Sequence, residues 1–477
     1  MFETIIGLEI HVELNTKSKI FCSCSTNFGA KANENTCPIC AGLPGTLPVL
    51  NEEVVHLAVR AGTALNCHIN KMSKFDRKNY FYPDLPKAYQ ITQFDLPICE
   101  NGYIDIRLDG KEKRIHITRI HLEEDSGKLI HIEDEPVTLV DYNRAGIPLI
   151  EIVTEPDMRS PQEAVAFLKA LKSILEYTGV SDCKMEQGSL RCDANISIRN
   201  IGEKGLNTKV EIKNMNSFKE ILKALQQEEK RQQELYAFGE EDKIKQETRR
   251  WDSSKGQTIP MRSKEDSHDY RYFPEADLTY VLIKEETILK IKEKLPELPR
   301  DKKERFLNMY DLSEAETDIL IGNKALANYF EEVVNFKVSP KEAANWIIGE
   351  LLRALKDEEN EDIPVESQHL ASLIKIIEEG KISRTAGKEV FKGLITTDKS
   401  PYEIIEEKGI SQISSADELE KIVEKVLSSQ TQAVDDYHNG NDRAIGFLMG
   451  QIMKASKGKA NPQSAKNILE KLIKATK

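Results

Sequence analysis

The sequence predicts an α+β protein in which a mixed-sheet domain precedes two all-helical domains. Short segments of alternating apolar and charged residues recur before residue 290, and such alternation is typical of half-buried strands. Beyond the proline-containing segment 295–299, apolar residues fall at helical spacing. The length of 477 residues is more than one core usually supports. We therefore expect domains at 1–294, 295–405 and 406–477.

Three segments carry the strand pattern most clearly, at 8–14, 190–199 and 210–213. In each of them every second residue is apolar and many of the others are ionisable. A solvated face of an antiparallel sheet explains this pattern. Carboxylates gathered on one face to hold metal ions explain it equally well.

Helix starts are marked by capping residues. Ser160–Glu163 combines a serine N-cap with a proline in the first turn, and Ser217–Glu220 opens a second helix. Gly179 is expected to end the first helix. Further capping boxes, Ser313–Glu316, Ser339–Glu342 and Ser415–Glu418, lie in the region expected to be all helix.

Composition and charge narrow the class of protein. Apolar residues make up 39% of the chain and charged residues 31%, which is typical of globular proteins. No run of 18 apolar residues and no secretory signal is present, so we expect a cytoplasmic protein with no membrane contact. The net charge of -12 argues against a general nucleic-acid coat. The stretch from Arg443 to Lys477, however, holds eight Lys/Arg and one acid, which indicates a docking surface for a polyanion or an ordinary solvated helical surface.

Four of the eight cysteines lie close together in the chain. Cys22-x-Cys24 is followed after twelve residues by Cys37-x-x-Cys40. This spacing predicts a zinc site, because zinc accepts four thiolates in a tetrahedron. Such a site has no open position, so its role would be structural. Four reduced, buried thiols are the alternative.

A second set of residues suits a hard metal ion. Its members are Glu9, His11, Glu123, Glu124, Glu151 and Asp193. Glu151 is the most informative of them, because it interrupts the apolar run 147–153 and a buried carboxylate needs a partner. Magnesium takes one or two carboxylates together with phosphate oxygens, whereas an imidazole is softer than it prefers. In an extended chain Glu123 and Glu124 point to opposite faces, and only a bulge would aim both at one site.

Aromatic and basic residues alternate in two segments, 74–89 and 270–274. Such residues can stack a base while Lys or Arg meets phosphate, although core aromatics at strand ends give the same pattern. Neither a Walker A motif nor G-x-G-x-x-G after a strand is present, so an ATP site here would be of another type. The sequence also shows no nucleophile elbow and no glutaminase cysteine signature.

Eight motifs, in order along the chain, resemble the B-subunit family of the bacterial aspartyl/glutamyl-tRNA amidotransferases. They are Gly7–Leu14, Cys37–Gly45, Asp76–Asp84, His121–Asp125, Asp141–Gly146, Leu149–Ile152, Arg191–Asn195 and Glu211–Asn214. The resemblance implies a cradle-shaped catalytic domain, a helical domain and a small helical tail that binds tRNA.

The resemblance also implies the reaction and its participants. ATP phosphorylates the side-chain carboxylate of misacylated Glu-tRNA(Gln) or Asp-tRNA(Asn), and ammonia then displaces phosphate. The expected cofactors are ATP, Mg²⁺ and structural Zn²⁺. The expected partners are the A subunit, which is an amidase that supplies the ammonia, and the small C subunit.

Site residues follow from the matching motifs. The resemblance makes Glu9, His11, Glu124 and Glu151 the catalytic magnesium positions, with Glu123 and Asp193 as additions. It implies a second group that contacts ATP, phosphate or the acceptor end of the tRNA: Lys78, Tyr80, Tyr82, Lys213, Asn214, Arg271 and Tyr272.

Two other classes of function explain part of the pattern. A non-enzymatic, zinc-containing tRNA-binding protein would bind RNA without ATP turnover, but Glu9, Glu124 and Glu151 argue against it because carboxylates repel RNA unless a metal lies between. A stand-alone, metal-dependent carboxylate kinase would need no basic tail, because its substrate is small.

Overall fold

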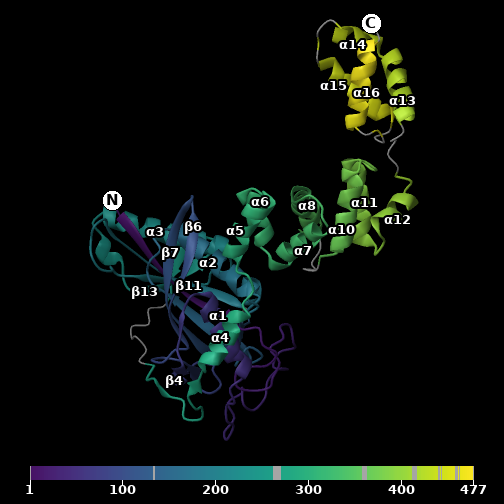
Figure 1. Cartoon of the computed structure of the whole chain (residues 1–477). Coiled ribbons are helices and arrows are strands. Elements are labelled where there is room, and N and C mark those ends of the chain that lie inside the picture. Colours follow the sequence, from purple (N-terminus) through teal and green to yellow (C-terminus); the bar gives the residue numbers. More distant parts are fainter. Residues whose placement is uncertain are drawn as a thin grey trace. The chain divides into compact units, whose positions relative to one another are not determined.

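A computed structural model of the chain describes residues 2–132, 135–261, 270–356, 363–410, 416–438, 441, 443–456, 460 and 462–475. The chain divides into two compact units, Met1–Pro299 and Arg300–Lys477. The first is rich in sheet and the second is helical (Figure 1). The α+β class is therefore confirmed at this level. The three domain limits at 1–294, 295–405 and 406–477 stay predictions.

A nine-stranded sheet forms the centre of the first unit, in the order β14-β13-β12-β11-β1-β10-β7-β6-β2. Neighbouring strands are antiparallel except β12 and β13, which are parallel. The strands are β1 (Phe2–Glu13), β2 (His68–Ile69), β6 (Cys99–Leu108), β7 (Lys111–Glu124), β10 (Pro148–Thr154), β11 (Leu190–Asn200), β12 (Val210–Lys213), β13 (Glu247–Asp252) and β14 (Gln257–Pro260). The three alternating segments, 8–14, 190–199 and 210–213, thus form part of β1, β11 and β12, as predicted. Only residue 14 lies beyond its strand, since β1 ends at Glu13.

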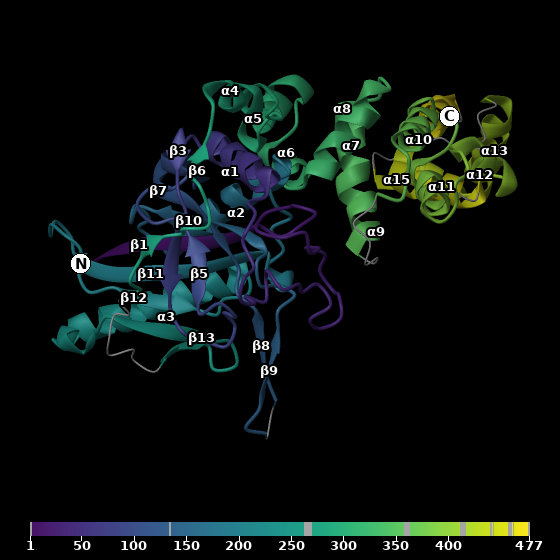
Figure 2. The ribbon, with the colours of Figure 1, turned by 90° about the horizontal axis from the view of Figure 1, so that it is seen from below.

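Three smaller sheets accompany the main one, in the orders β15-β4-β5, β16-β3 and β8-β9. The β8–β9 hairpin projects from the rest of the unit (Figure 2). Their strands are β3 (Met72–Ser73), β4 (Asp76–Asn79), β5 (Tyr89–Thr92), β8 (Lys128–His131), β9 (Thr138–Asp141), β15 (Phe273–Pro274) and β16 (Val281–Leu282).

One face of the main sheet is apolar and buried. On β1 it carries Ile6, Leu8, Ile10 and Val12, which join a single core with side chains of α1 (Glu52–Ala64), α2 (Pro161–Tyr177) and α3 (Phe218–Ala237). The predicted starts of α2 and α3 are confirmed. Ser160 and Ser217 accept hydrogen bonds from the Glu163 and Glu220 amides, respectively. Gly179 follows α2 with a φ of 69°, which favours glycine. The helices thus cover the apolar face, and the ionisable residues of the same strands face the other way.

The remaining helices continue from the end of the first unit through the second. They are α4 (Glu285–Glu293), α5 (Pro299–Tyr310), α6 (Glu314–Ile321), α7 (Lys324–Asn335), α8 (Pro340–Trp346), the π-helical turn Ile347–Leu351, α9 (Leu352–Lys356), α10 (Ser367–Glu378), α11 (Arg384–Thr396), α12 (Pro401–Glu407), α13 (Ala416–Ser429), α14 (Thr431–His438), α15 (Arg443–Ala455) and α16 (Pro462–Ala475). The last four share a core of their own around Val423, Leu448 and Leu469.

Two predicted helix starts in this part are confirmed. Ser313 and Glu316 form a reciprocal capping box, and Ser339 caps α8. Ser415 lies outside the described residues. Of the helices described, none combines the length and apolar character needed to cross a membrane.

Candidate active site on the polar face of the sheet

The register of four neighbouring strands brings ionisable residues into one row. His11 on β1 lies opposite Arg191 on β11 and Glu151 on β10, and Glu151 lies opposite His121 on β7. Glu123, two residues along β7 from His121, points to the same face. We call His11, His121, Glu123 and Glu151 the His–Glu cluster.

The members of this cluster touch one another. His11 Nε2 lies 3.3 Å from Glu123 Oε1 and 3.6 Å from Glu151 Oε2. His121 Nε2 lies 2.9 Å from Glu151 Oε2 and 3.7 Å from Glu123 Oε2. Two imidazoles and two carboxylates therefore surround one small volume.

The cluster is largely withdrawn from water, and this affects its ionisation. Burial opposes protonation of His121, but hydrogen bonds to Glu123 and Glu151 prevail and raise its pKa to about 9. Burial likewise raises the pKa of Glu151, yet the adjoining His121 outweighs it and the net pKa lies below the usual value. The imidazoles thus hold the carboxylates in the ionised form, which is the form that binds a cation.

The donor set fits a hard divalent ion. One ligand atom each from His11, Glu123 and Glu151 lies within 4.8 Å of the other two. Two carboxylates suit magnesium, and the imidazole is the weaker match. His121 Nδ1 is buried with no hydrogen-bond partner among the described residues.

Glu9 and Asp193 stand next to the cluster and outside it. They lie opposite each other on β1 and β11, on the same face as His11. Asn195 Nδ2 donates a hydrogen bond to Glu9 Oε1 at 3.0 Å, and Lys213 Nζ lies 2.6 Å from Asp193 Oδ2. They extend the acidic surface along β1 and β11.

Glu124 departs from the arrangement that the sequence suggested. β7 pairs with β10 in unbroken register from Glu124 to Arg119, so no bulge turns both glutamates to one side. Glu124 instead receives hydrogen bonds from Lys87 Nζ at 2.5 and 2.7 Å and from the Ile91 amide at 2.9 Å. The structure therefore places Glu124 apart from His11 and Glu151, because alternation along β7 directs its carboxylate to the opposite face. Its role as a metal ligand stays a prediction.

The two aromatic and basic segments, far apart in sequence, meet beside the cluster. β15 pairs with β4, and the Asn79 amide donates to the Tyr270 carbonyl at 2.9 Å. Lys78 Nζ lies 4.8 Å from the centre of the Tyr270 ring. We call Tyr80, Phe94, Tyr270 and Tyr272 the aromatic wall.

The rings of the aromatic wall stack on one another, and the charges of the His–Glu cluster act on its neighbours. The rings of Phe94 and Tyr272 stack at 4.2 Å with an angle of 7° between their planes. Burial opposes the charge on Lys78, but the Glu123 carboxylate and its neighbours raise its pKa. Burial also raises the pKa of Tyr272, with Glu151 and Glu123 contributing. The half-buried side chains of Lys78 and Tyr272 therefore both experience the charges of Glu123 and Glu151.

The other predicted contact residues lie in varied settings. Lys213 ends β12, and the backbone of Asn214 is left-handed with a φ of 62°. Tyr82 is exposed, as is Arg271, whose φ is 44°. Tyr80 is half-buried, and burial raises its pKa.

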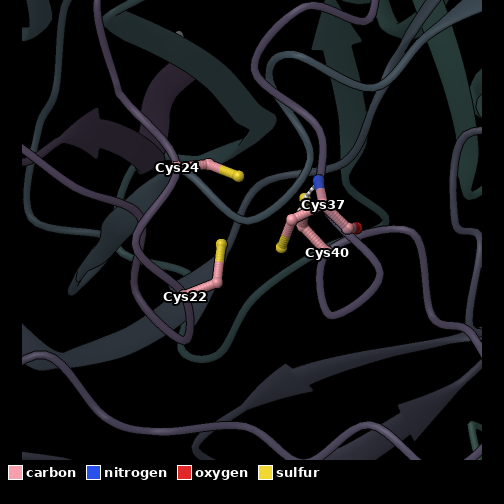
Figure 3. Close-up of side chains that lie close together, drawn as sticks. All are labelled: Cys22, Cys24, Cys37 and Cys40. Atoms are coloured by element: carbon pink, nitrogen blue, oxygen red, sulfur yellow. Dashed lines mark hydrogen bonds between the residues drawn. The ribbon is translucent and has the colours of Figure 1, made fainter.

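The four clustered cysteines come together as predicted. Their sulfur atoms lie within 4.8 Å of one another, and the side chains of Cys22, Cys24 and Cys37 converge on a common space (Figure 3). The Cys37 amide donates to Cys40 Sγ at 3.2 Å. A hydrogen bond from Cys22 lowers the pKa of Cys40 to about 4, and the amide of Cys37 and the charge of Lys19 act in the same direction. The group fits a tetrahedral thiolate site.

Comparison with known proteins decides the family. Residues 4–289 match the GatB/GatE catalytic domain and residues 328–473 match the GatB domain. The chain is 61% identical over 474 residues to the B subunit of the aspartyl/glutamyl-tRNA(Asn/Gln) amidotransferase of Clostridium beijerinckii, covering 99% of each chain.

The chain belongs to the GatB family.

Other relatives carry the same description. The B subunit from Clostridium acetobutylicum is 58% identical over 99% of each chain, and the one from Thermoanaerobacter pseudethanolicus is 54% identical over 98%. The resemblance seen in the motifs is thus confirmed, and with it the predicted function as a subunit of a tRNA-dependent amidotransferase, a ligase of protein biosynthesis. Neither alternative function is favoured.

In this GatB-family chain, the predicted set of site residues omitted three that the structure places there, His121, Phe94 and Tyr270. His121 stands in the His121–Asp125 motif, and its alternation with Glu123 was the available signal. Tyr270 lies in the aromatic segment 270–274. Phe94 gave no local signal, because its contact with Tyr272 depends on tertiary structure.

Proposed function

We propose that this GatB-family chain activates and amidates the side-chain carboxylate of misacylated Glu-tRNA(Gln) or Asp-tRNA(Asn). A carboxylate oxygen of the aminoacyl group attacks the γ-phosphorus of ATP and ADP leaves. Ammonia then attacks the resulting acyl phosphate, and phosphate departs with that oxygen. The observation that carries this proposal is the convergence of His11, Glu123 and Glu151 on the polar face of the main sheet. The Glu123 carboxylate also raises the pKa of Lys78 on β4.

Magnesium would be held by His11, Glu123 and Glu151. His121 would orient Glu151 through the contact between its Nε2 and Glu151 Oε2. When bound, Mg²⁺ would neutralise the phosphate and carboxylate oxygens that must approach each other. Glu9 and Asp193 remain candidates for a further ion. Glu124 is left out of the ligand set because its carboxylate is occupied by Lys87.

The aromatic wall and Lys78 would receive the aminoacyl end of the tRNA. Flat rings stack unpaired bases without regard to sequence, and the half-buried Lys78 ammonium suits an anionic side chain. Tyr82, Arg271, Lys213 and Asn214 are proposed as further contacts with phosphate or the acceptor end. The polar face together with the β15-β4-β5 sheet would give the cradle-like form of this domain.

Two further subunits would complete the enzyme. We assign glutamine hydrolysis to the amidase, which is the A subunit of the enzyme, and the clasping of the pair to the small C subunit. We place the reaction in the cytoplasm, where aminoacyl-tRNAs are made and used. The four cysteines would hold a structural Zn²⁺.

The helical tail would contact the tRNA body. Of its basic residues, Arg443, Lys454, Lys466, Lys471 and Lys474 are exposed. Lys457, Lys459 and Lys477 lie outside the described residues.

The test is ATP hydrolysis by the assembled complex with charged and with uncharged tRNA. We expect turnover to rise only with Glu-tRNA(Gln) or Asp-tRNA(Asn), because the carboxylate is a reactant. Equal turnover with uncharged tRNA would contradict the proposal, and so would tRNA binding without any turnover.

A further inference from the structure

The side chain of Lys19 is fully buried beside the four clustered cysteines. Its exposed fraction is 0%, and it is one of the largest side chains hidden completely from solvent. Its Nζ lies 3.6 Å from Cys40 Sγ, the sulfur that also accepts from the Cys37 amide. A buried ammonium is strongly unfavourable unless it is hydrogen-bonded and matched by negative charge. The surroundings of Lys19 therefore need to supply an anion.

The hydrogen bonds of this ammonium satisfy its protons, but two of its partners are neutral. Nζ donates to the carbonyl oxygens of Asn35 at 2.8 Å and Tyr142 at 3.1 Å, and Cys40 Sγ is its third acceptor. An ammonium has three protons, so each has an acceptor. Within the part of the chain that the structure describes, no carboxylate lies within ion-pair distance of Lys19. Of its three acceptors, only the Cys40 sulfur can carry a negative charge.

A second lysine near the cysteines is already paired. Lys87 lines the same cavity as Lys19, Cys22 and Cys40. Its Nζ lies 2.5 and 2.7 Å from the two carboxylate oxygens of Glu124, which compensates its charge. Lys87 is thus a poorer counter-charge for the sulfur atoms than Lys19.

The two states that the cysteines can adopt make different demands on Lys19. Four reduced thiols are neutral and would leave the buried ammonium without a counter-charge. Four thiolates around Zn²⁺ carry two negative charges in excess, and a neighbouring ammonium offsets one of them. The contact between Lys19 and Cys40 therefore favours the metal-bound form of the cysteine group over reduced thiols.

The backbone on both sides holds Lys19 in this position. The Lys19 amide donates to the Cys24 carbonyl at 3.0 Å, and the Ile20 amide donates to the Gly146 carbonyl at 2.9 Å. Gly146 has a φ of 84°, and a Cβ built there would lie 3.5 Å from Lys19 Cδ. The stem of Lys19 thus passes close to Gly146 before its ammonium reaches Cys40.

The same ammonium joins the cysteine loop, residues 22–40, to the segment 140–143. Asn35, whose carbonyl accepts from Lys19, donates its own amide to Asn143 Oδ1 at 2.8 Å. The Asn33 amide donates to Asp141 Oδ1 at 2.9 Å. Lys19 therefore lies where the cysteine loop, the segment 140–143 and the Cys40 sulfur meet.

We propose that Lys19 is the counter-charge of the four-cysteine site. Its buried ammonium offsets part of the negative charge of the metal-bound thiolates and holds Cys40 against the segment 140–143. Lys19 is a positioning residue, because it acts on the metal through Cys40. This inference rests on the zinc site of the proposed function and is independent of the reaction.

The experiment compares the assembled complex carrying the wild-type chain, Lys19→Met or Lys17→Met. Lys17 is exposed and two residues away, so it is the matched control. Zinc affinity is measured by competition with a chelator, and thermal unfolding is recorded with and without zinc. We expect Lys19→Met to weaken zinc binding by about 10–100-fold, as is usual when a metal ligand loses its outer partner. The rise in unfolding temperature that zinc gives should shrink accordingly, and Lys17→Met should behave as the wild type.

A double-mutant cycle separates the charge of Lys19 from its packing. Cys24→His replaces one thiolate by a neutral ligand, so the zinc site carries one negative charge fewer. The counter-charge role predicts that Lys19→Met costs less zinc affinity in the Cys24→His background than in the wild-type background. Equal cost in the two backgrounds would show that Lys19 acts through packing alone and would overturn the assignment.

Unchanged zinc affinity in Lys19→Met would also overturn the assignment, while leaving the proposed function in place. Folded wild-type protein that binds no zinc would instead refute the zinc site itself. If Lys19→Met does not fold, the double variant Lys19→Met/Cys24→His decides. Recovery of folded, zinc-containing protein supports the counter-charge role, and failure of both variants to fold contradicts it.

Discussion

His121 Nε2 lies 2.9 Å from Glu151 Oε2, across two neighbouring strands of the main sheet. This contact fixes the Glu151 carboxylate, which also faces His11. The orientation of Glu151 as a candidate metal ligand therefore depends on His121. Outer partners of this kind usually matter nearly as much as the ligands themselves.

We predict that His121→Gln reduces amide formation by about 10–100-fold, because the Glu151 carboxylate loses its orienting partner. The loss should be partly restored by raised Mg²⁺ concentration. The measurement is a magnesium titration of amide formation. A defect that is independent of magnesium would point to a structural role for His121.

Glu151→Gln should abolish amide formation and leave tRNA binding intact, because the carboxylate is proposed to hold metal and not RNA. Amide product and tRNA retention are measured separately. Glu155→Gln is the control, since Glu155 is exposed and lies just beyond the end of β10. Near-normal amidation by Glu151→Gln would remove the metal-site assignment.

The ion pair of Arg77 and Glu275 ties the aromatic wall to the domain. Arg77 Nε and Nη2 each lie 2.7 Å from an oxygen of the buried Glu275 carboxylate. Glu275→Ala should cost about 1–2 kcal/mol of unfolding free energy, because it removes a buried, bidentate partner and leaves the half-buried Arg77 guanidinium with Asp277 alone. The affinity for charged tRNA should fall while ATP affinity remains. Equal loss of both affinities would show that the pair supports the whole site.

Cys37→Ser should lose zinc and lower stability by several kcal/mol, because metal binding contributes directly to folding. Activity should fall only as far as the folded fraction falls. Metal analysis and thermal unfolding measure this, with Cys67→Ser as the control that keeps its zinc. Folded wild-type protein free of zinc would contradict the assignment.

The salt dependence of tRNA binding tests the tail. Replacing Lys466, Lys471 and Lys474 by Gln should weaken binding and reduce the slope of log affinity against log salt by up to about three. Lys290→Gln, exposed on α4, is the control. An unchanged slope would identify the basic residues as an ordinary solvated helical face.

The sequence predicted those parts of the site that depend on local pattern. Alternation placed Glu9 and His11 on one face of β1, and the spacing of Cys22 to Cys40 indicated a thiolate group before any tertiary contact was known. The rest depends on register and long-range pairing. Alternation with Glu123 places His121 on the same face, but its contact with Glu151 follows from the pairing of β7 with β10.

The same limit explains why half of the aromatic wall, Phe94 and Tyr270, is missing from the predicted site. Alternation alone places Glu123 and Glu124 on opposite faces, and the unbroken register of β7 excludes the bulge that would have aimed both at one site. The pairing of β15 with β4 joins segments about two hundred residues apart, and no local signal encodes it.

The central claim is that the aminoacyl carboxylate itself becomes phosphorylated. It is tested by supplying Glu-tRNA(Gln) labelled with ¹⁸O in the side-chain carboxylate and analysing the phosphate released during amide formation. We expect one ¹⁸O atom in each phosphate, because that oxygen bridges carbon and phosphorus before ammonia displaces it. Amide formation with no ¹⁸O in the phosphate would contradict the account.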